Sequence, residues 1–380
     1  PLRDRYEGEF YGLFLLMAFA LILVGCANNL LMIFLSVEFV SLISYILTGF
    51  LKQDVKSKEA AIKYLLFGSV ASAIMLYGMS LVYGISGSLE LPVIGKAFSS
   101  SFSPLGKIAV LFFFAGLGFK ISMAPFHMWA PDVYEGAPTP VTAFLTVGPK
   151  ALGFAVLIRV LATIFSPLTS EWTPILTLLS ILTMTLGNIT AISQNNIKRF
   201  LAYSSIAQAG YILMGLAVFS SVGLQGVLIY LLAYLFTNLG AFAIVLLVSE
   251  ATGSEQIEDY AGLSKRSPLI AAFFAVFLLS LTGIPPLAGF IGKFYVFAGA
   301  IEAKAFTLAI AAIINSAIAA YYYFRIIRLM YLAPAPQHTV FHPSSSLLLS
   351  AGILFVGTVM IGTVPGPFIS WVKTAFLFLN

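Results

Sequence analysis

Charged residues are scarce in this sequence. Only 9 % of its 380 residues are Asp, Glu, Lys or Arg, and 60 % are hydrophobic, whereas an ordinary soluble domain is about 25 % charged. Many apolar runs also exceed 18 residues, the length that indicates a transmembrane helix. The composition therefore excludes a soluble globular domain and indicates a polytopic protein embedded in a lipid bilayer.

Cysteine is almost absent, because Cys26 is the single thiol. One thiol excludes an internal disulfide, a cysteine-ligated iron–sulfur cluster and a zinc ribbon within this chain. The phosphate-binding P-loop motif, the dinucleotide-binding glycine motif and the H-E-x-x-H metal motif are missing as well. The chain thus has no recognisable cofactor or metal site, and the energy for any transport must come from a partner or an ion gradient.

Long apolar segments are what the sequence does contain. Eleven are long enough to cross a membrane, which takes about 20 helical residues, and they lie near residues 9–26, 28–51, 60–84, 108–130, 139–162, 173–193, 199–219, 223–249, 269–300, 305–331 and 347–377. Lipid admits only helices and closed barrels, and continuous apolar runs exclude the alternating pattern of a barrel. The predicted fold is all-α with about eleven transmembrane helices.

Lysine and arginine divide unequally between the two sides that eleven spans define. Five fall on one side: Lys96, Lys107, Arg159, Lys304 and Lys373. Twelve fall on the other: Arg3, Arg5, Lys52, Lys56, Lys58, Lys63, Lys198, Arg199, Lys265, Arg266, Arg325 and Arg328. The richer side is expected to face the cytoplasm or its topological equivalent.

Four ionisable residues fall inside spans rather than in connections: Glu38, Lys120, Lys150 and Lys293. A charge at the centre of a bilayer costs roughly 2.5 to 3.5 kcal/mol, so these residues are candidates for a role in charge or proton movement. Lys63 lies about one turn inside the third span, where it either snorkels to the surface or serves a buried role.

Prolines interrupt two spans beside intramembrane lysines. Pro125 follows Lys120 in the fourth span, and the pair 285–286 precedes Lys293 in the ninth; proline lacks an N–H donor and breaks helices. The apolar run 269–300 has 32 residues, so one straight helix would be about 48 Å long, beyond a hydrocarbon core of about 30 Å. Both helices are expected to break within the membrane.

Breaks at corresponding positions of two halves are the signature of a transporter built from repeats. The two interrupted spans are five apart, and a unit of five helices ends on the side opposite to its start, so the second unit must be inverted. We predict a first half at 1–162, an inverted second half at 163–331, and a loop with a C-terminal helix at 332–380.

A buried lysine beside a carboxylate suits proton exchange, because burial disfavours the charged amine and a nearby carboxylate favours it. Glu38 is the candidate partner of Lys120; a static ion pair with Lys120 or Lys63 is the alternative. His127, beside the first break, is either a packing residue or a proton relay. Residues 132–135 are expected to form a turn, and tyrosines 321–323 a packing or interfacial cluster.

Three long motifs, in order, resemble those of subunit N of the proton-translocating NADH-quinone oxidoreductases, called subunit 2 in organelles. They are K-I-S-M-A-P-F-H-M-W-A-P-D-V-Y-E-G-A-P-T-P-V from Lys120, N-I-K-R-F-L-A-Y-S-S-I-A-Q-A-G-Y from Asn196, and S-L-T-G-I-P-P-L-A-G-F-I-G-K-F from Ser280. The resemblance implies fourteen helices with two inverted five-helix units, so these spans would be helices four to fourteen of an N-terminally truncated chain.

The same resemblance implies a function. This chain would be the membrane-arm subunit of an enzyme in which quinone reduction elsewhere drives proton transfer, with no redox catalysis of its own. Its relay residues would be Glu38, Lys120, Lys150 and Lys293, with Lys63 matching a lysine of the family's sixth helix.

Flavin, iron–sulfur clusters and quinone would belong to partner subunits, and the partners would include sister antiporter-like subunits but no nucleic acid. The expected site is a cell inner or plasma membrane, with a thylakoid or mitochondrial inner membrane as the alternative. The alternative function is a subunit of a multi-subunit cation/proton antiporter; such proteins share the lysine pattern but usually lack the D-V-Y-E-G segment.

Overall fold

The computed structural model describes residues 6–100, 104–335 and 344–377, and all regular structure in them is helical. Contacts divide the chain into two compact units, residues 1–175 and 176–380. The predicted all-α class is confirmed. The described residues contain no β-strand, only one isolated β-bridge in each unit: Asn29 with Glu90, and Asn196 with Gln256.

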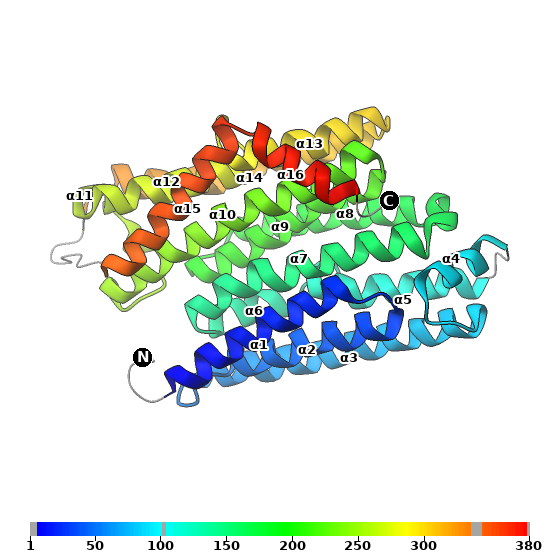
Figure 1. The fold of residues 1–380 in the computed structure, drawn as a ribbon. Helices are drawn as coiled ribbons and strands as arrows, with labels where there is room; N and C mark the ends of the chain where they lie inside the picture. Colours follow the sequence, from blue (N-terminus) through cyan, green and yellow to red (C-terminus); the bar gives the residue numbers. More distant parts are fainter. Residues whose placement is uncertain (1–5, 101–103, 336–343, 378–380) are drawn as a thin grey trace. The chain divides into compact units, whose positions relative to one another are not determined.

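The first unit contains the long helices that carry Glu38, Lys120 and Lys150. Its elements are α1 (Glu7–Cys26), α2 (Leu30–Thr48), α3 (Val55–Ser86), α4 (Leu91–Ser100), α5 (Pro104–Ile121), α6 (Trp129–Gly136), α7 (Thr139–Thr163), the 3-10 turn η1 (Ser166–Leu168) and the start of α8 (Thr169–Ile192). Helix α2 packs between α1 and α3, and α3 packs along α5 (Figure 1).

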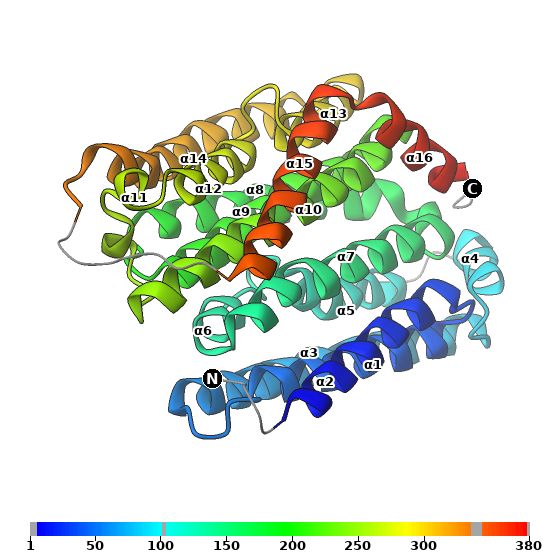
Figure 2. The same ribbon diagram turned by 60° about the vertical axis from the view of Figure 1, so that its left-hand side comes forward.

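The second unit is organised around its longest helix, α10. Besides the rest of α8, its elements are α9 (Ile197–Val218), α10 (Ser221–Thr252), η2 (Ile257–Tyr260), α11 (Leu263–Arg266), α12 (Pro268–Thr282), α13 (Ala288–Glu302), α14 (Phe306–Leu332), α15 (Ser345–Thr363) and α16 (Gly366–Leu377). Helix α10 packs against α9, α12, α13 and α15, and α15 crosses it obliquely (Figure 2).

The structure accounts for each predicted span. Ten described helices are long and apolar enough to cross a membrane. The remaining predicted span, residues 269–300, is the pair α12 and α13, each of 15 residues, with the break between them at residues 283–287. The fourth span breaks where α5 ends at Ile121.

Two local predictions were wrong. Residues 347–377 are two helices rather than one span, because Pro365, directly before α16, cannot continue α15. Residues 132–135 belong to the short helix α6 rather than to a turn. Pro131 lies in the first turn of α6, where an N–H has no intrahelical partner, so it does not disturb the helix.

The same local devices recur in both units. Helices α3 and α10 each have 32 residues and end at a glycine with positive φ, Gly87 (64°) and Gly253 (69°). Helices α2 and α9 each begin at an asparagine cap, Asn29 and Asn196, whose side chain accepts a backbone N–H of the first turn. Each asparagine also forms the isolated bridge to the loop that follows the 32-residue helix.

Contacts between loops agree with the alternating sides inferred from charge. In the first unit, Arg159 near the end of α7 donates to Asn28 between α1 and α2 at 3.0 Å. In the second unit, Arg325 near the end of α14 donates to the carbonyls of Ile192 and Gln194, at 2.7 and 3.0 Å, where α8 ends. Residues assigned to one side therefore meet within each unit.

Candidate functional site

Lys120 lies in the last turn of α5 and pairs with a carboxylate from α2. Its side chain is 6 % exposed, and its Nζ donates to Oε1 of Glu38 at 3.3 Å and to Oγ of Ser41 at 2.5 Å. Glu38 and Ser41 are three residues apart, which places them on one face of α2. The structure thus brings together the lysine and the glutamate that the sequence singled out.

A third helix completes this first site. Ser72 of α3 donates its hydroxyl to Oε1 of Glu38 at 2.6 Å. Ser41 meanwhile donates to the Val37 carbonyl at 2.7 Å, so its oxygen is oriented to accept from Lys120. Glu38 is 24 % exposed, which leaves one edge of the pair open. Sequence reasoning missed both serines, because a serine in a membrane helix is ordinary until its neighbours are known.

The break after α5 is a hydrogen-bonded structure rather than a loose end. Ser122 adopts a positive φ of 59°, and the Met123 N–H donates to the Gly118 carbonyl at 2.7 Å. The indole N–H of Trp129 donates to the Phe119 carbonyl at 3.0 Å. Carbonyls that lose partners at a helix end must be satisfied in a dry environment, so these bonds hold Lys120 at a defined depth.

Lys63 pairs with acids other than Glu38. Its Nζ lies 2.8 Å from both Glu59 and Asp132, and its side chain is 39 % exposed. Lys63 therefore does not form the ion pair with Glu38 that was the alternative, because it pairs with Glu59 and Asp132 instead. It joins α3 to α6 at a half-exposed position.

A second ion pair strengthens the same junction, with Lys56 lying 3.5 Å from Glu135. Sequence reasoning missed both acids as partners of these lysines. The signal was present in the spacing: Lys56 and Lys63 are seven residues apart on α3, and Asp132 and Glu135 are three apart on α6, so each pair shares a helix face. We infer that these ion pairs attach α6 to α3.

Lys150 is 1 % exposed in α7 and follows Pro149, which deprives that helix of one N–H donor. Gly153 lies one turn further on the same face. A Cβ atom at Gly153 would lie 2.6 Å from Cγ2 of Ile121 and 3.3 Å from Cβ of Lys120. Helices α7 and α5 are therefore in close contact beside both lysines.

His127 lies in the break between α5 and α6. Its carbonyl accepts the Ala130 N–H at 3.0 Å, and its Nδ1 has no hydrogen-bond partner in the described part of the chain. Among the same residues it forms no hydrogen bond to Glu38 or Lys120. The structure does not join His127 to the first lysine site.

Lys293 forms the second lysine site, after the break between α12 and α13. It is 6 % exposed, and its Nζ donates to the Thr282 carbonyl at 2.8 Å and to Ser316 Oγ at 3.4 Å. The same Nζ lies 4.4 Å from the centre of the Tyr211 ring. In the residues that the structure describes, no carboxylate lies within 4.0 Å of it.

Buried tyrosines surround this site. Of the tyrosines expected to form an interfacial or packing cluster, Tyr321 is 62 % exposed, whereas Tyr322 and Tyr323 are fully buried and pack against Phe200. Tyr322 donates to Asn188 at 2.8 Å, and Tyr323 shares a hydrogen bond of 2.5 Å with Ser204. Sequence reasoning missed this network, since the asparagine and serine lie in other helices.

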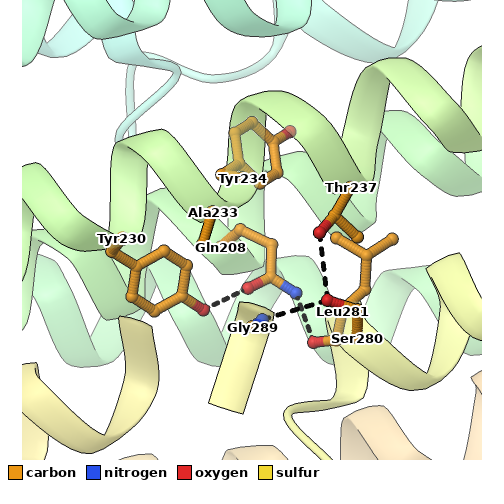
Figure 3. A pocket seen from close by; sticks show the side chains of 8 residues that line it. All are labelled: Gln208, Tyr230, Ala233, Tyr234, Thr237, Ser280, Leu281 and Gly289. Atoms are coloured by element: carbon orange, nitrogen blue, oxygen red, sulfur yellow. Dashed lines mark hydrogen bonds between the residues drawn. The ribbon is translucent and has the colours of Figure 1, made fainter. Parts of the chain in front are cut away.

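Figure 3 shows a small cavity beside Gln208 in the second unit, lined by Gln208, Tyr230, Ala233, Tyr234, Thr237, Ser280, Leu281 and Gly289. Gln208 accepts from Tyr230 and donates to the Leu281 carbonyl at 2.9 Å, while Ser280 accepts the Gly289 N–H at 3.0 Å. The cavity has a volume of about 10 Å³, which is at the lower limit for one water molecule. It is not a cofactor pocket.

The described residues contain no group of three or more His, Cys, Asp or Glu side chains that could hold a metal ion.

A family profile described as "NADH:quinone oxidoreductase/Mrp antiporter, TM" matches residues 27–319. The chain belongs to this family. Together with the relatives described next, this match confirms the resemblance drawn from the three motifs.

Curated relatives are similar over most of the chain. NADH-quinone oxidoreductase subunit N 2 of Sorangium cellulosum is 45 % identical, and the match covers 100 % of this chain and 78 % of that protein. NAD(P)H-quinone oxidoreductase subunit 2 of a Picosynechococcus strain is 52 % identical over 80 % of this chain and 59 % of its own length.

Solved structures share the fold. A chain of respiratory complex I from Thermus thermophilus with bound aureothin superposes with a TM-score of 0.84 at 36 % identity, covering 97 % of this chain and 81 % of that one. A chain of the Mrp complex from Dietzia sp. gives a TM-score of 0.86 at 23 % identity, over 96 % and 76 %, and shows the fold alone.

Proposed function

We propose that this chain is the proton-translocating membrane-arm subunit of an NADH-quinone oxidoreductase, in which quinone reduction elsewhere in the assembly drives proton transfer through Glu38, Lys120, Lys150 and Lys293. The observation that carries the proposal is the ion pair of buried Lys120 with partly buried Glu38 at a helix break. Ionisable residues at membrane depth that face one another across helices mark proton pathways.

The pair can take up and release a proton because its two members favour opposite outcomes. Lys120 is buried, which favours the neutral amine, while Glu38 at 3.3 Å favours the ammonium. When Glu38 is protonated or withdrawn, the ammonium loses its counter-charge and passes its proton to an acceptor. The amine of Lys150, on the helix packed against α5, is the proposed acceptor.

The next step, from Lys150 toward Lys293, is proposed from the order of lysines in the two halves, 1–162 and 163–331, with 332–380 as a tail. The ion pairs of Lys63 with Glu59 and Asp132 favour a docking role for this lysine over a place in the relay. Among the described residues, His127 forms no hydrogen bond to Lys120 or Glu38, so we propose that it belongs to the loop between α5 and α6 and not to the relay.

The remaining components would lie in partner subunits. Flavin, iron–sulfur clusters and quinone would be held there, and sister antiporter-like subunits would adjoin this chain in the bilayer. Its relatives carry bacterial, cyanobacterial and chloroplast names. We propose a cell inner or plasma membrane, with a thylakoid or mitochondrial membrane as the alternative.

A second candidate is a subunit of a multi-subunit cation/proton antiporter, which the shared fold of an Mrp chain supports. Purification of the native assembly separates the two functions. Flavin, iron–sulfur clusters and quinone-reductase activity in the preparation support the redox pump. Their absence together with sodium-dependent proton exchange would replace it by the antiporter.

The relay itself is tested with Lys120→Met in the reconstituted assembly. We expect normal assembly and a proton-to-electron ratio well below that of the wild type, because the amine is lost while the side-chain volume is kept. The matched control is Lys58→Met on α3, an exposed lysine, for which pumping should be unchanged. Unimpaired pumping by Lys120→Met would overturn the relay.

A further inference from the structure

At the second lysine site, the described residues that contact the cation are all uncharged. Three neutral groups contact the Lys293 amine: the Thr282 carbonyl, the Ser316 hydroxyl and the face of the Tyr211 ring. Thr282 is the last residue of α12, so the break frees its carbonyl to accept from the lysine. An aromatic face attracts a cation most strongly when both are buried, and Lys293 is 6 % exposed and Tyr211 fully buried.

Hydrogen bonds fix the position of the Tyr211 ring. Asn188 of α8 donates to the Tyr211 hydroxyl at 3.2 Å and accepts from Tyr322 at 2.8 Å. The same amide donates to Oδ1 of Asn315 at 3.1 Å. Ser316, whose hydroxyl accepts from Lys293, follows Asn315 directly in α14.

The side chains of this network that hold the ring are buried to 3 % exposure or less: Asn188, Tyr211, Asn315 and Tyr322. A buried amide whose donors and acceptor are all engaged cannot turn without losing several hydrogen bonds, so Asn188 holds the ring in one orientation. The network therefore has a defined geometry beside Lys293, the lysine of α13.

The titratable groups around Lys293 are tyrosines. On the described helices packed against α13, the buried titratable groups are Tyr211 on α9, Tyr230 and Tyr234 on α10, and Tyr322 and Tyr323 on α14, besides Lys198 of α9, which pairs with Glu255 at 2.9 Å. The other titratable residues of these helices and of α13 are partly or fully exposed: Arg199, Tyr203, Glu250, Tyr295, Glu302, Tyr321, Arg325, Arg328 and Tyr331. Helices α12 and α15 carry no titratable side chain. Arg325 of α14 donates instead to the carbonyls at the end of α8.

We propose that Tyr211 and Asn188 are positioning residues that stabilise protonated Lys293, the first by its ring and the second by holding that ring in place. This inference rests on the proposed function, since it assigns how Lys293, the last lysine of the relay, keeps its proton. Oriented neutral dipoles do at Lys293 what a carboxylate does at Lys120.

The test compares the pH dependence of proton pumping in reconstituted assemblies of the full enzyme. In Tyr211→Leu, the ring is lost and the ammonium is less stable. The pH at which pumping falls off on the alkaline side should then move down by about one pH unit. In Ser316→Asp, a carboxylate replaces the hydroxyl beside Nζ of Lys293. The pH at which pumping falls off on the alkaline side should then move up.

Further variants keep the test decisive. Tyr211→Phe and Asn188→Leu retain the ring but remove its anchor, so each should give a smaller downward shift even if Tyr211→Leu does not assemble. The control is Tyr321→Leu on the exposed face of α14, which should leave the profile in place. A general loss of packing would lower activity without moving the profile in opposite directions.

Lys293→Met separates failure of this inference from failure of the relay. If Lys293→Met pumps like the wild type, the proposed relay is wrong at this residue, and the inference is overturned with it. If Lys293→Met abolishes pumping while Tyr211→Phe, Asn188→Leu and Ser316→Asp leave the pH profile unmoved, the relay stands and the positioning role is wrong.

Discussion

The two units each place a buried lysine beside a broken helix, yet they balance its charge differently. Lys120 precedes its break and pairs with Glu38, whereas Lys293 follows its break and is held by a carbonyl, a hydroxyl and an aromatic ring. The first arrangement depends on a second ionisable group, and the second does not. We infer that proton affinity at the first site responds to the state of a carboxylate, while at the second it is set by fixed dipoles.

Among substitutions that test this difference between the two lysine sites, we expect the largest effect at Glu38. In Glu38→Gln, the buried Lys120 would lose its counter-charge, and an uncompensated buried charge is strongly destabilising. We expect the assembly to lose most of its pumping and to unfold at a lower temperature. In Glu38→Gln/Lys120→Met no unpaired charge remains, so thermal stability should partly recover.

Melting temperatures of the single and double variants measure this coupling. Purely additive losses would contradict the view that the first site is a charge pair. No corresponding recovery is expected at the second site, because the part of the chain that the structure describes places no carboxylate within 4.0 Å of the Lys293 amine.

An intermediate effect is expected where α7 packs on α5. In Gly153→Ala, the new methyl group would lie 2.6 Å from Cγ2 of Ile121, and overpacking of this kind costs about 1 to 3 kcal/mol. The change should destabilise the first unit and reduce pumping by separating the helices of Lys120 and Lys150. Thermal unfolding of the assembly and its proton-to-electron ratio measure the two effects.

Gly84→Ala is the matched control, since it lies in the exposed part of α3 and a Cβ there meets nothing within 4 Å. That substitution should be neutral or stabilise the helix by up to about 1 kcal/mol. Equal behaviour of the two alanine variants would show that close contact of α5 and α7 does not matter.

The smallest effect is expected at the junction of α3 and α6, which has a partly exposed ion pair. Asp132→Asn should weaken the contact with Lys63 by about 1 kcal/mol or less, and the loss should shrink as salt is added. Limited proteolysis near α6 at low and high salt would detect the change. A large loss that is independent of salt would mean that Asp132 has a role beyond docking.

Periodicity and charge alone predicted much of the fold. Apolar runs located every span, and prolines located both internal breaks, because lipid leaves a backbone little choice but a helix and proline is a reliable interruption. Prediction failed at the C-terminal run, where Pro365 was treated as part of one span, and at α6, where glycine and prolines suggested a turn.

The sequence by itself determined that the chain is helical, crosses the membrane and carries lysines where lysine is costly, because these properties depend on composition and order along one helix. It also singled out Glu38 as the intramembrane acid. Only the tertiary structure decided which groups face each lysine: Ser41 and Ser72 complete the first site, and Tyr211 and Asn188 the second. Such partners come from helices far apart in sequence, and no local pattern records which faces will meet.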